Sequence, residues 1–123
     1  MKKIFLIEDD VTLAEMYEEQ FKMSGFDTVV AKNSEEVIQK IDSSMNLILL
    51  DILLPDKKGF EVLKDIKSKN EYKNIPVIIL TNLGVKDADR DIKLAISLGA
   101  TDYLVKAYNT PDQVVNKVKE ILK

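Results

Sequence analysis

The chain has 123 residues, a length that suits one domain able to bury a real hydrophobic core. It contains no cysteine and no histidine, which excludes disulfides, zinc thiolates, imidazole bases and a phosphohistidine supplied by the chain itself. The net charge is -3 with no basic run, which argues against a nucleic-acid surface.

The first residues, MKKIFLI, combine a charged start with an apolar run, as a secretory signal does. The apolar run covers only Ile4–Ile7 before acidic residues end it, whereas a signal needs about 7–15 apolar residues. No stretch of the sequence reaches the roughly 20 apolar residues of a membrane span. We therefore predict a strand here, and we expect a soluble, cytoplasmic protein.

Five short apolar runs alternate with amphipathic segments along the chain. The runs are rich in Ile, Val and Leu and mostly lack polar alternation, which is typical of strands buried on both faces. They are Ile4–Ile7, Thr28–Ala31, Leu47–Leu50, Val77–Leu80 and Tyr103–Val105. After each run, apolar residues recur at helical spacing, which predicts five helices with these stripes: Leu13, Met16, Tyr17, Gln20 and Phe21; Val37, Ile38 and Ile41; Phe60, Leu63 and Ile66; Ile92, Ala95 and Ile96; and Val114, Val115, Val118, Ile121 and Leu122.

Residues with known preferences for helix ends support these helices. Asn33 or Ser34 is a predicted N-cap of the second helix, and Glu36 completes a capping box. Gly99 suits the position that follows the fourth helix, and Pro111 suits the first turn of the fifth.

The alternation of strands and single helices predicts a parallel sheet with right-handed crossovers. The first and third runs are the most apolar and belong in the centre of the sheet. We therefore predict an α/β fold, a flavodoxin-like doubly wound five-stranded parallel sheet in the order 2-1-3-4-5 with five helices. Residues 1–123 are expected to form one domain, and the end of the chain just after the last stripe predicts no effector domain beyond it.

Acidic residues follow two of the predicted strands. Glu8 and Asp9 follow the first strand, and Asp51 follows the third. In a doubly wound sheet, ligands bind beyond the carboxyl ends of the strands, at the switch point between these two strands. Neighbouring carboxylates need a cation or a proton to lie close together. With oxygen ligands and no imidazole or thiolate, a hard divalent ion is favoured, Mg²⁺ first.

Thr81 follows the fourth predicted strand and Lys106 the fifth, at the same edge of the sheet. Each polar residue taken alone has a simpler interpretation. Asp10 is better explained as a helix cap, Asp51 could begin a turn, Thr81 is an ordinary strand residue, and most lysines are solvated surface residues. The convergence of an acidic pair, a lone Asp, a hydroxyl and a lysine at one edge predicts a functional site.

The whole chain resembles a bacterial response-regulator receiver domain of the chemotaxis-regulator type. The resemblance rests on four segments: FLIEDD, LILLDILLPDKKG, VIILTN and GATDYLVK. It implies that Asp51 accepts a phosphoryl group from a sensor histidine kinase or a histidine phosphotransfer protein. It also implies a Mg²⁺ ion held by Glu8, Asp9 and Asp51 and by the backbone carbonyl of Leu53.

The resemblance implies further roles for residues across the site. Thr81, Lys106 and the Asn82 N–H would contact the phosphoryl group. Thr81 and Tyr103 would act as the switch, although half-buried sheet packing explains Tyr103 equally well. The face formed by the fourth helix, fifth strand and fifth helix would then bind a downstream protein target.

We expect a monomer or weak homodimer that binds neither nucleic acid nor membrane. It would not be an enzyme, although it would assist its own phosphorylation and dephosphorylation.

Two residues depart from the family's pattern. The family usually has a proline after its lysine, in a cis peptide, but here Ala107 follows Lys106. A cis bond before a residue other than proline costs about 3 kcal/mol, so both a trans bond with a differently aimed lysine and a strained cis bond stay open. Asn82 stands where the family prefers a very small residue, and it could restrict bulky phosphodonors.

Leu53 and Leu83 are apolar where the family's hydrolytic water passes, so we hypothesise a long-lived phosphoaspartate.

Three other functions are open to the same sequence pattern. An FMN-binding electron carrier needs a loop after the first strand that holds phosphate, but EDDVTL would repel one. A Mg²⁺-dependent phosphatase commonly has a second Asp at the position of Leu53. A pseudo-receiver, a protein-binding module that is never phosphorylated, conflicts with the complete acidic set. It stays open because of Ala107.

Overall fold

The computed structural model describes residues 1–82 and 88–123. The strands are β1 (Lys3–Ile7), β2 (Asp27–Ala31), β3 (Leu47–Leu50), β4 (Val77–Thr81) and β5 (Asp102–Val105). The helices are α1 (Val11–Met23), α2 (Ser34–Lys40), α3 (Gly59–Lys67), α4 (Ala88–Ser97) and α5 (Pro111–Ile121). A short 3-10 helix, η2 (Lys106–Tyr108), connects β5 to α5.

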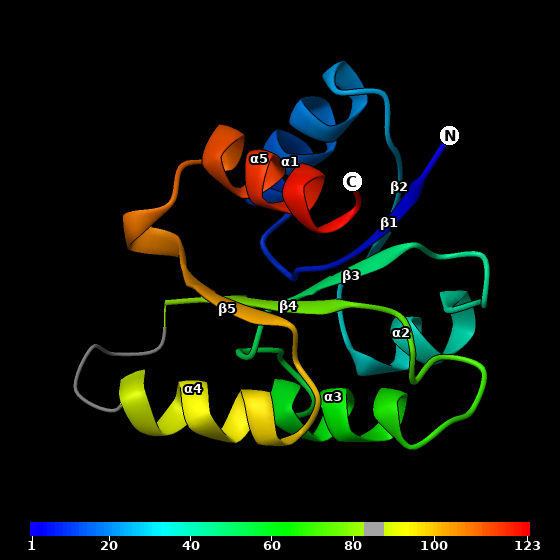
Figure 1. The fold of residues 1–123 in the computed structure, drawn as a ribbon, viewed down its shortest axis with the longest axis vertical. Helices are drawn as coiled ribbons and strands as arrows, with labels where there is room; N and C mark the ends of the chain where they lie inside the picture. Colours follow the sequence, from blue (N-terminus) through cyan, green and yellow to red (C-terminus); the bar gives the residue numbers. More distant parts are fainter. Residues whose placement is uncertain (83–87) are drawn as a thin grey trace.

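The five strands form one sheet in the order β2-β1-β3-β4-β5, and every pairing is parallel. This confirms the predicted flavodoxin-like fold. Helices α1 and α5 cover one face of the sheet, and α2, α3 and α4 cover the other (Figure 1). Successive crossovers of the same hand produce these two layers, because a right-handed connection moves to the opposite face when the direction along the sheet reverses.

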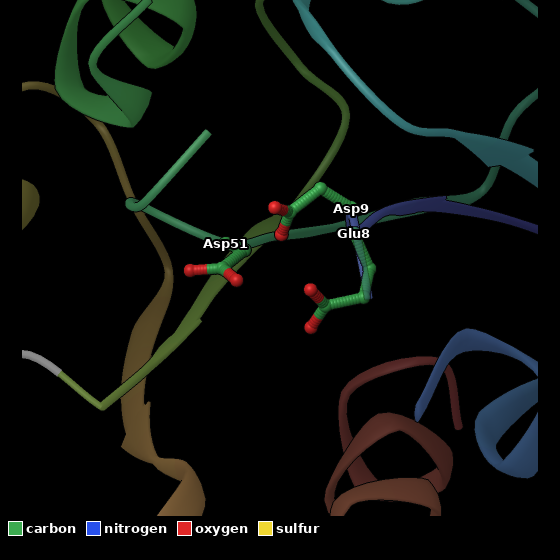
Figure 2. Close-up of side chains that lie close together, drawn as sticks. All are labelled: Glu8, Asp9 and Asp51. Atoms are coloured by element: carbon green, nitrogen blue, oxygen red, sulfur yellow. The ribbon is translucent and has the colours of Figure 1, made fainter. Parts of the chain in front are cut away.

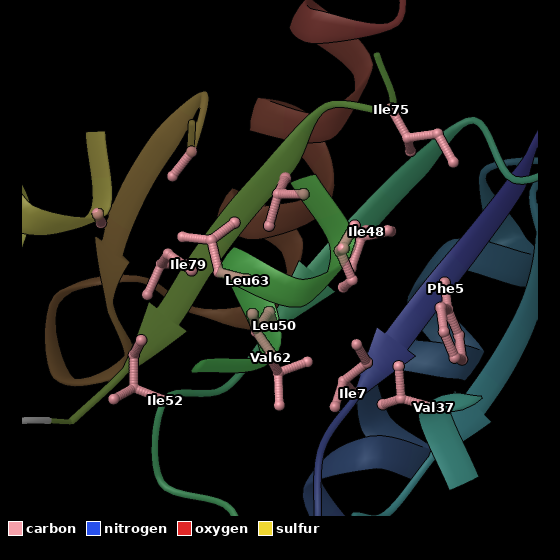
Figure 3. Packing of buried hydrophobic residues seen from close by; sticks show 14 of the residues in the cluster. Phe5, Ile7, Val37, Ile48, Leu50, Ile52, Val62, Leu63, Ile75 and Ile79 are labelled. Carbon is pink, nitrogen blue, oxygen red and sulfur yellow. The ribbon is translucent and has the colours of Figure 1, made fainter. Parts of the chain in front are cut away.

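Each strand supplies side chains to a core on both faces of the sheet. In β1, Phe5 and Ile7 pack toward α2 and α3, while Ile4 and Leu6 pack toward α1 and α5. Figure 3 shows the first of these cores, with side chains from β1, β3 and β4 meeting those of α2 and α3. Burial on both faces explains why the strands read as continuous apolar runs.

The helix stripes are correct in position but wrong in three residues. Met16, Ile38 and Ile96 were predicted to face the core, but they are 48%, 72% and 48% exposed. Ala95 is buried as predicted, and Ala14, which no predicted stripe included, is buried as well, because a small side chain lets a helix approach the sheet closely. Among the helices of the described residues, none combines the length and apolar character that crossing a membrane requires.

The predicted helix ends are also present. The Asn33 side chain accepts a hydrogen bond from the Glu36 N–H at 2.8 Å, which makes Asn33 rather than Ser34 the N-cap of α2. The Glu36 carboxylate accepts from the Lys32 N–H, one residue before the expected position. Gly99 has a φ of 103° after α4, and Pro111 begins α5, as predicted.

Candidate functional site

Parallel pairing brings the ends of β1 and β3 together at one edge of the sheet. Ile7 pairs with Leu50, so Glu8 and Asp51 follow neighbouring strands at the same level. One carboxylate oxygen from each of Glu8, Asp9 and Asp51 lies within 4.8 Å of the others (Figure 2). Glu8 is 2% and Asp51 5% exposed, whereas Asp9 is exposed to solvent. The acidic cluster predicted from the strand ends is therefore present.

Lys106 reaches this cluster from the end of β5. Its Nζ lies 2.5 Å from Glu8 Oε1 and 2.8 Å from Asp51 Oδ2. The Lys106–Ala107 peptide bond is trans, because the described residues contain no cis bond. A trans bond at this position does not turn the lysine away from the site. Of the two alternatives left open by the sequence, the trans bond is correct and the strained cis bond is excluded.

Burial, hydrogen bonds and neighbouring charges change the pKa values of Glu8 and Lys106. Burial raises the pKa of Glu8 to about 7; the Lys106 hydrogen bond opposes this rise and the Asp51 charge adds to it. Burial acts to lower the pKa of Lys106, but hydrogen bonds to Asp51 and Glu8 outweigh it, and the pKa is raised. Lys106 is therefore firmly cationic. It partly neutralises two buried carboxylates.

The loop that follows Asp51 folds back closely against it. The Leu53 N–H donates to Asp51 Oδ1 at 2.9 Å, and the Gly59 N–H donates to the Ile52 carbonyl at 2.8 Å. A Cβ on Gly59 would lie 2.4 Å from Ile52 Cα and 2.7 Å from the Asp51 carbonyl oxygen. Only glycine permits this approach of the backbone, so Gly59 holds the loop against the acidic cluster.

The other predicted site residues lie on β4, β5 and the loop after β4. Thr81 is the last residue of β4 and is fully buried. Tyr103 is 8% exposed and packs within the core beside α4; burial raises the pKa of its hydroxyl. Asn82 is exposed and follows Thr81. Leu83, predicted to flank the path of the hydrolytic water, lies outside the described residues.

One residue near the charged site was predicted only as part of a core stripe. Tyr17, on α1, is 1% exposed, and burial raises the pKa of its hydroxyl to about 12. The charge of Lys106 opposes this rise, while those of Glu8 and Asp51 add to it, so Tyr17 borders the site electrostatically. Helical spacing could place it only on the buried face of α1 and gave no sign of this proximity.

Two connections between loops also had no sequence signal. The Asp56 carboxylate accepts hydrogen bonds from the Ser34 N–H at 3.0 Å and from its hydroxyl at 2.7 Å, which lowers the pKa of Asp56. This ties the loop after β3 to the start of α2. The Ala107 N–H donates to Asn82 Oδ1 at 2.9 Å and ties the loops after β4 and β5 together.

The fold and the acidic edge of the sheet define a receiver domain, and comparison with known proteins agrees. The chain belongs to the response regulator receiver domain family, whose sequence profile matches residues 4–119. It is accordingly a receiver domain of a two-component response regulator, a class of signalling proteins.

Individual relatives extend the comparison. The transcriptional regulatory protein CpxR homolog of Haemophilus influenzae is 37% identical over 123 residues, all of this chain and 51% of the relative. The chain thus spans about half the length of the curated relatives it matches. A CheY-like receiver domain protein from Methanospirillum hungatei JF-1 superposes with a TM-score of 0.86 at 25% identity, over 99% of this chain and 94% of that one. The BeF3-activated N-terminal receiver domain of Klebsiella pneumoniae RstA gives 0.82 at 28% identity, over 99% of both chains.

Proposed function

We propose that Asp51 accepts a phosphoryl group from a histidine of a sensor kinase or a phosphotransfer protein. The observation that supports this most directly is the cluster of three carboxylates around the Lys106 ammonium. The chain has no histidine, so the donor imidazole has to come from a partner. A buried Asp beside a fixed cation suits an acceptor for phosphoryl transfer, where catalysis consists mainly of positioning and charge neutralisation.

The residues of the cluster fit a Mg²⁺ ion. Glu8, Asp9 and Asp51 offer oxygen ligands only, which Mg²⁺ prefers, and the exposed position of Asp9 leaves the cluster open to solvent. We propose that these carboxylates and the Leu53 carbonyl hold the ion. When bound, Mg²⁺ neutralises charge on the oxygens of the transferred group.

In the proposed transfer, an Asp51 carboxylate oxygen attacks phosphorus in line with the bond to the donor imidazole. The new oxygen–phosphorus bond forms as the nitrogen–phosphorus bond breaks, and the imidazole leaves with the electron pair. Both Asp51 oxygens hold hydrogen bonds in this structure, one from Leu53 and one from Lys106. Lys106 would exchange its bond to Asp51 for one to the incoming phosphoryl oxygens. Its positive charge then stays beside the negative charge that arrives.

The signal would pass through Thr81 and Tyr103. The Thr81 hydroxyl and the Asn82 N–H would donate to the phosphoryl group, and Tyr103 would respond to the movement of Thr81. Tyr103 is buried in this structure, so switching would exchange this conformation with a more exposed one. The output surface would be the α4–β5–α5 face. With a net charge of -3 on the chain, a protein is the better proposed partner there than nucleic acid.

Phosphorylation can be tested by intact-mass measurement after incubation with acetyl phosphate and Mg²⁺. We expect one phosphoryl adduct on the wild-type chain and none on Asp51→Asn. Asp27→Asn is the matched control, because Asp27 is an exposed aspartate at the start of β2, at the opposite edge of the sheet. It should take up the adduct normally. The absence of an adduct on the wild-type chain would contradict the proposal and favour a module that binds protein without being phosphorylated.

A further inference from the structure

The two residues that depart from the receiver pattern lie in contact. Asn82 follows β4 and Ala107 follows Lys106, and the Ala107 N–H donates to Asn82 Oδ1 at 2.9 Å. A backbone N–H can only donate, so the carboxamide oxygen must be the atom that faces it. We call this contact the Asn82–Ala107 bond. It requires a residue other than proline at position 107, because proline has no N–H to donate.

The bond lies where two paired strands end. Thr81 pairs with Val105, so Asn82 and Lys106 are the next residue on each strand, where the sheet hydrogen bonds stop. The chain then turns into η2, and Asn109 closes this turn by donating from Nδ2 to the Val105 carbonyl at 2.9 Å. The Asn82 side chain therefore continues the cross-strand connection one residue past the sheet.

The Asn82–Ala107 bond restricts the peptide plane between Lys106 and Ala107. This plane carries the Ala107 N–H and begins at the Lys106 carbonyl, so its orientation helps to set where the Lys106 side chain leaves the backbone. From there Lys106 extends to Glu8 and Asp51, with its Nζ 2.5 and 2.8 Å from their oxygens. A flexible lysine chain depends on a fixed starting point to keep its ammonium in one place.

We propose that Asn82 is a positioning residue for Lys106, acting through the Ala107 N–H. This inference rests on the proposed phosphoryl transfer and assigns a new role to the Asn82 side chain within it. Because Asn82 directly follows Thr81 and Ala107 directly follows Lys106, the bond joins the neighbour of the residue that carries the switch hydroxyl to the neighbour of the residue that carries the cation. The two sides of the phosphoryl site then move as one unit rather than independently.

The first test measures phosphorylation by phosphoramidate, a small donor that is not hindered by the size of the Asn82 side chain. Asn82→Ala should lower the second-order rate constant by roughly 2- to 12-fold, the range of one neutral hydrogen bond. In an Ala107→Pro background the same substitution should change nothing further, because the donor is already absent. An equal loss in both backgrounds, or a wild-type rate for Asn82→Ala, would overturn the inference.

Asn46→Ala is the matched control. Asn46 accepts from the Lys3 N–H at 2.8 Å, which is the same kind of bond, but it lies at the opposite edge of the sheet. Its loss should lower stability and leave the phosphorylation rate unchanged. A rate loss in Asn46→Ala as large as in Asn82→Ala would mean that general loosening causes the effect, and this would also overturn the inference.

A second measurement does not depend on phosphorylation or on the folding of Ala107→Pro. In NMR experiments on the full chain, Asn82→Ala should speed hydrogen exchange at the Ala107 amide and shift the signal of the Lys106 ammonium. If neither changes, Asn82 does not position Lys106. If the wild-type chain forms no adduct on Asp51, the proposed function fails by itself, and this measurement still decides the role of Asn82.

Discussion

The half of the site that carries Asp51, the proposed phosphoacceptor, lies at the ends of β1 and β3 and is called the acceptor half. It differs from the lysine half, at the ends of β4 and β5. In the acceptor half, Glu8 and Asp51 are 2% and 5% exposed, and neighbouring backbone holds their carboxylates. In the lysine half, the exposed side chain of Asn82 accepts the hydrogen bond from the Ala107 N–H that orients the Lys106–Ala107 peptide. The acceptor is thus positioned by the core and the cation by a loop. We expect the two halves to respond differently to substitution.

Lys106 joins the two halves through its ion pairs with Glu8 and Asp51, and its removal should have the largest effect. Lys106→Met leaves Glu8 and Asp51 buried without their cation, which should lower the free energy of unfolding by about 3 kcal/mol. Phosphorylation should slow by about 100-fold, because a fixed positive charge is lost where negative charge arrives. Urea unfolding and the acetyl phosphate assay measure the two effects.

The control for this substitution is Lys57→Met. Lys57 forms a 2.6 Å ion pair with Asp65, but that pair is largely exposed and should contribute less than about 1 kcal/mol. Added Mg²⁺ should restore much of the stability of Lys106→Met, because a second cation can replace the ammonium. Equal losses for the two lysine variants would contradict the distinction between a buried and an exposed pair.

A substitution at Gly59 tests whether the backbone holds the acceptor half. Gly59→Ala should cost about 3 kcal/mol and weaken Mg²⁺ binding, because the new Cβ would lie 2.4 Å from Ile52 Cα. Gly25→Ala is the control: Gly25 has a φ of 86° but no atom near the new Cβ, so only backbone strain remains, about 1 kcal/mol. Thermal unfolding of the two variants, followed by Mg²⁺ titration, compares them. Equal destabilisation would show that the contact with Ile52 can relax.

The pH dependence of stability tests the electrostatics of the acceptor half without metal. The folded pKa of Glu8 is about 7, above its ordinary value of 4.5, so the folded chain binds the extra proton between these pH values. The free energy of unfolding should therefore fall, by about 3 kcal/mol, as pH rises from about 4.5 to 7 in EDTA. Glu8→Gln should remove this part of the slope in urea unfolding. An identical slope in both proteins would assign the effect to other groups.

The smallest expected effect concerns the lifetime of the phosphoaspartate. Leu53 is 53% exposed beside Asp51 and has no polar side-chain atom to orient a hydrolytic water. We expect slow loss of radiolabelled phosphate from the wild-type chain. Leu53→Asn should speed this loss several-fold, by about the contribution of one hydrogen bond. Loss from the wild-type chain within seconds would contradict the hypothesis.

Most of the acceptor half was predictable from the sequence. The apolar runs before Glu8 and Asp51 indicated buried parallel strands, and the carboxyl ends of neighbouring parallel strands meet at one edge. The close approach of Gly59 to Ile52 was not predicted, because the sequence does not show which backbone atoms a glycine approaches. The ammonium of Lys106 was predicted at the site, but the path of its loop was not.

Hydrophobic periodicity depends on each residue's own side chain and can be found in the sequence. It predicts the strand order, the two layers of helices and the edge of the sheet that carries the acidic residues. The Asn82–Ala107 bond, the tie between Ser34 and Asp56 and the proximity of Tyr17 to the site were decided only by the tertiary structure. These contacts join residues far apart in the chain through single polar groups. Single groups of this kind leave no periodic pattern in a sequence, so these contacts are found only in the folded structure.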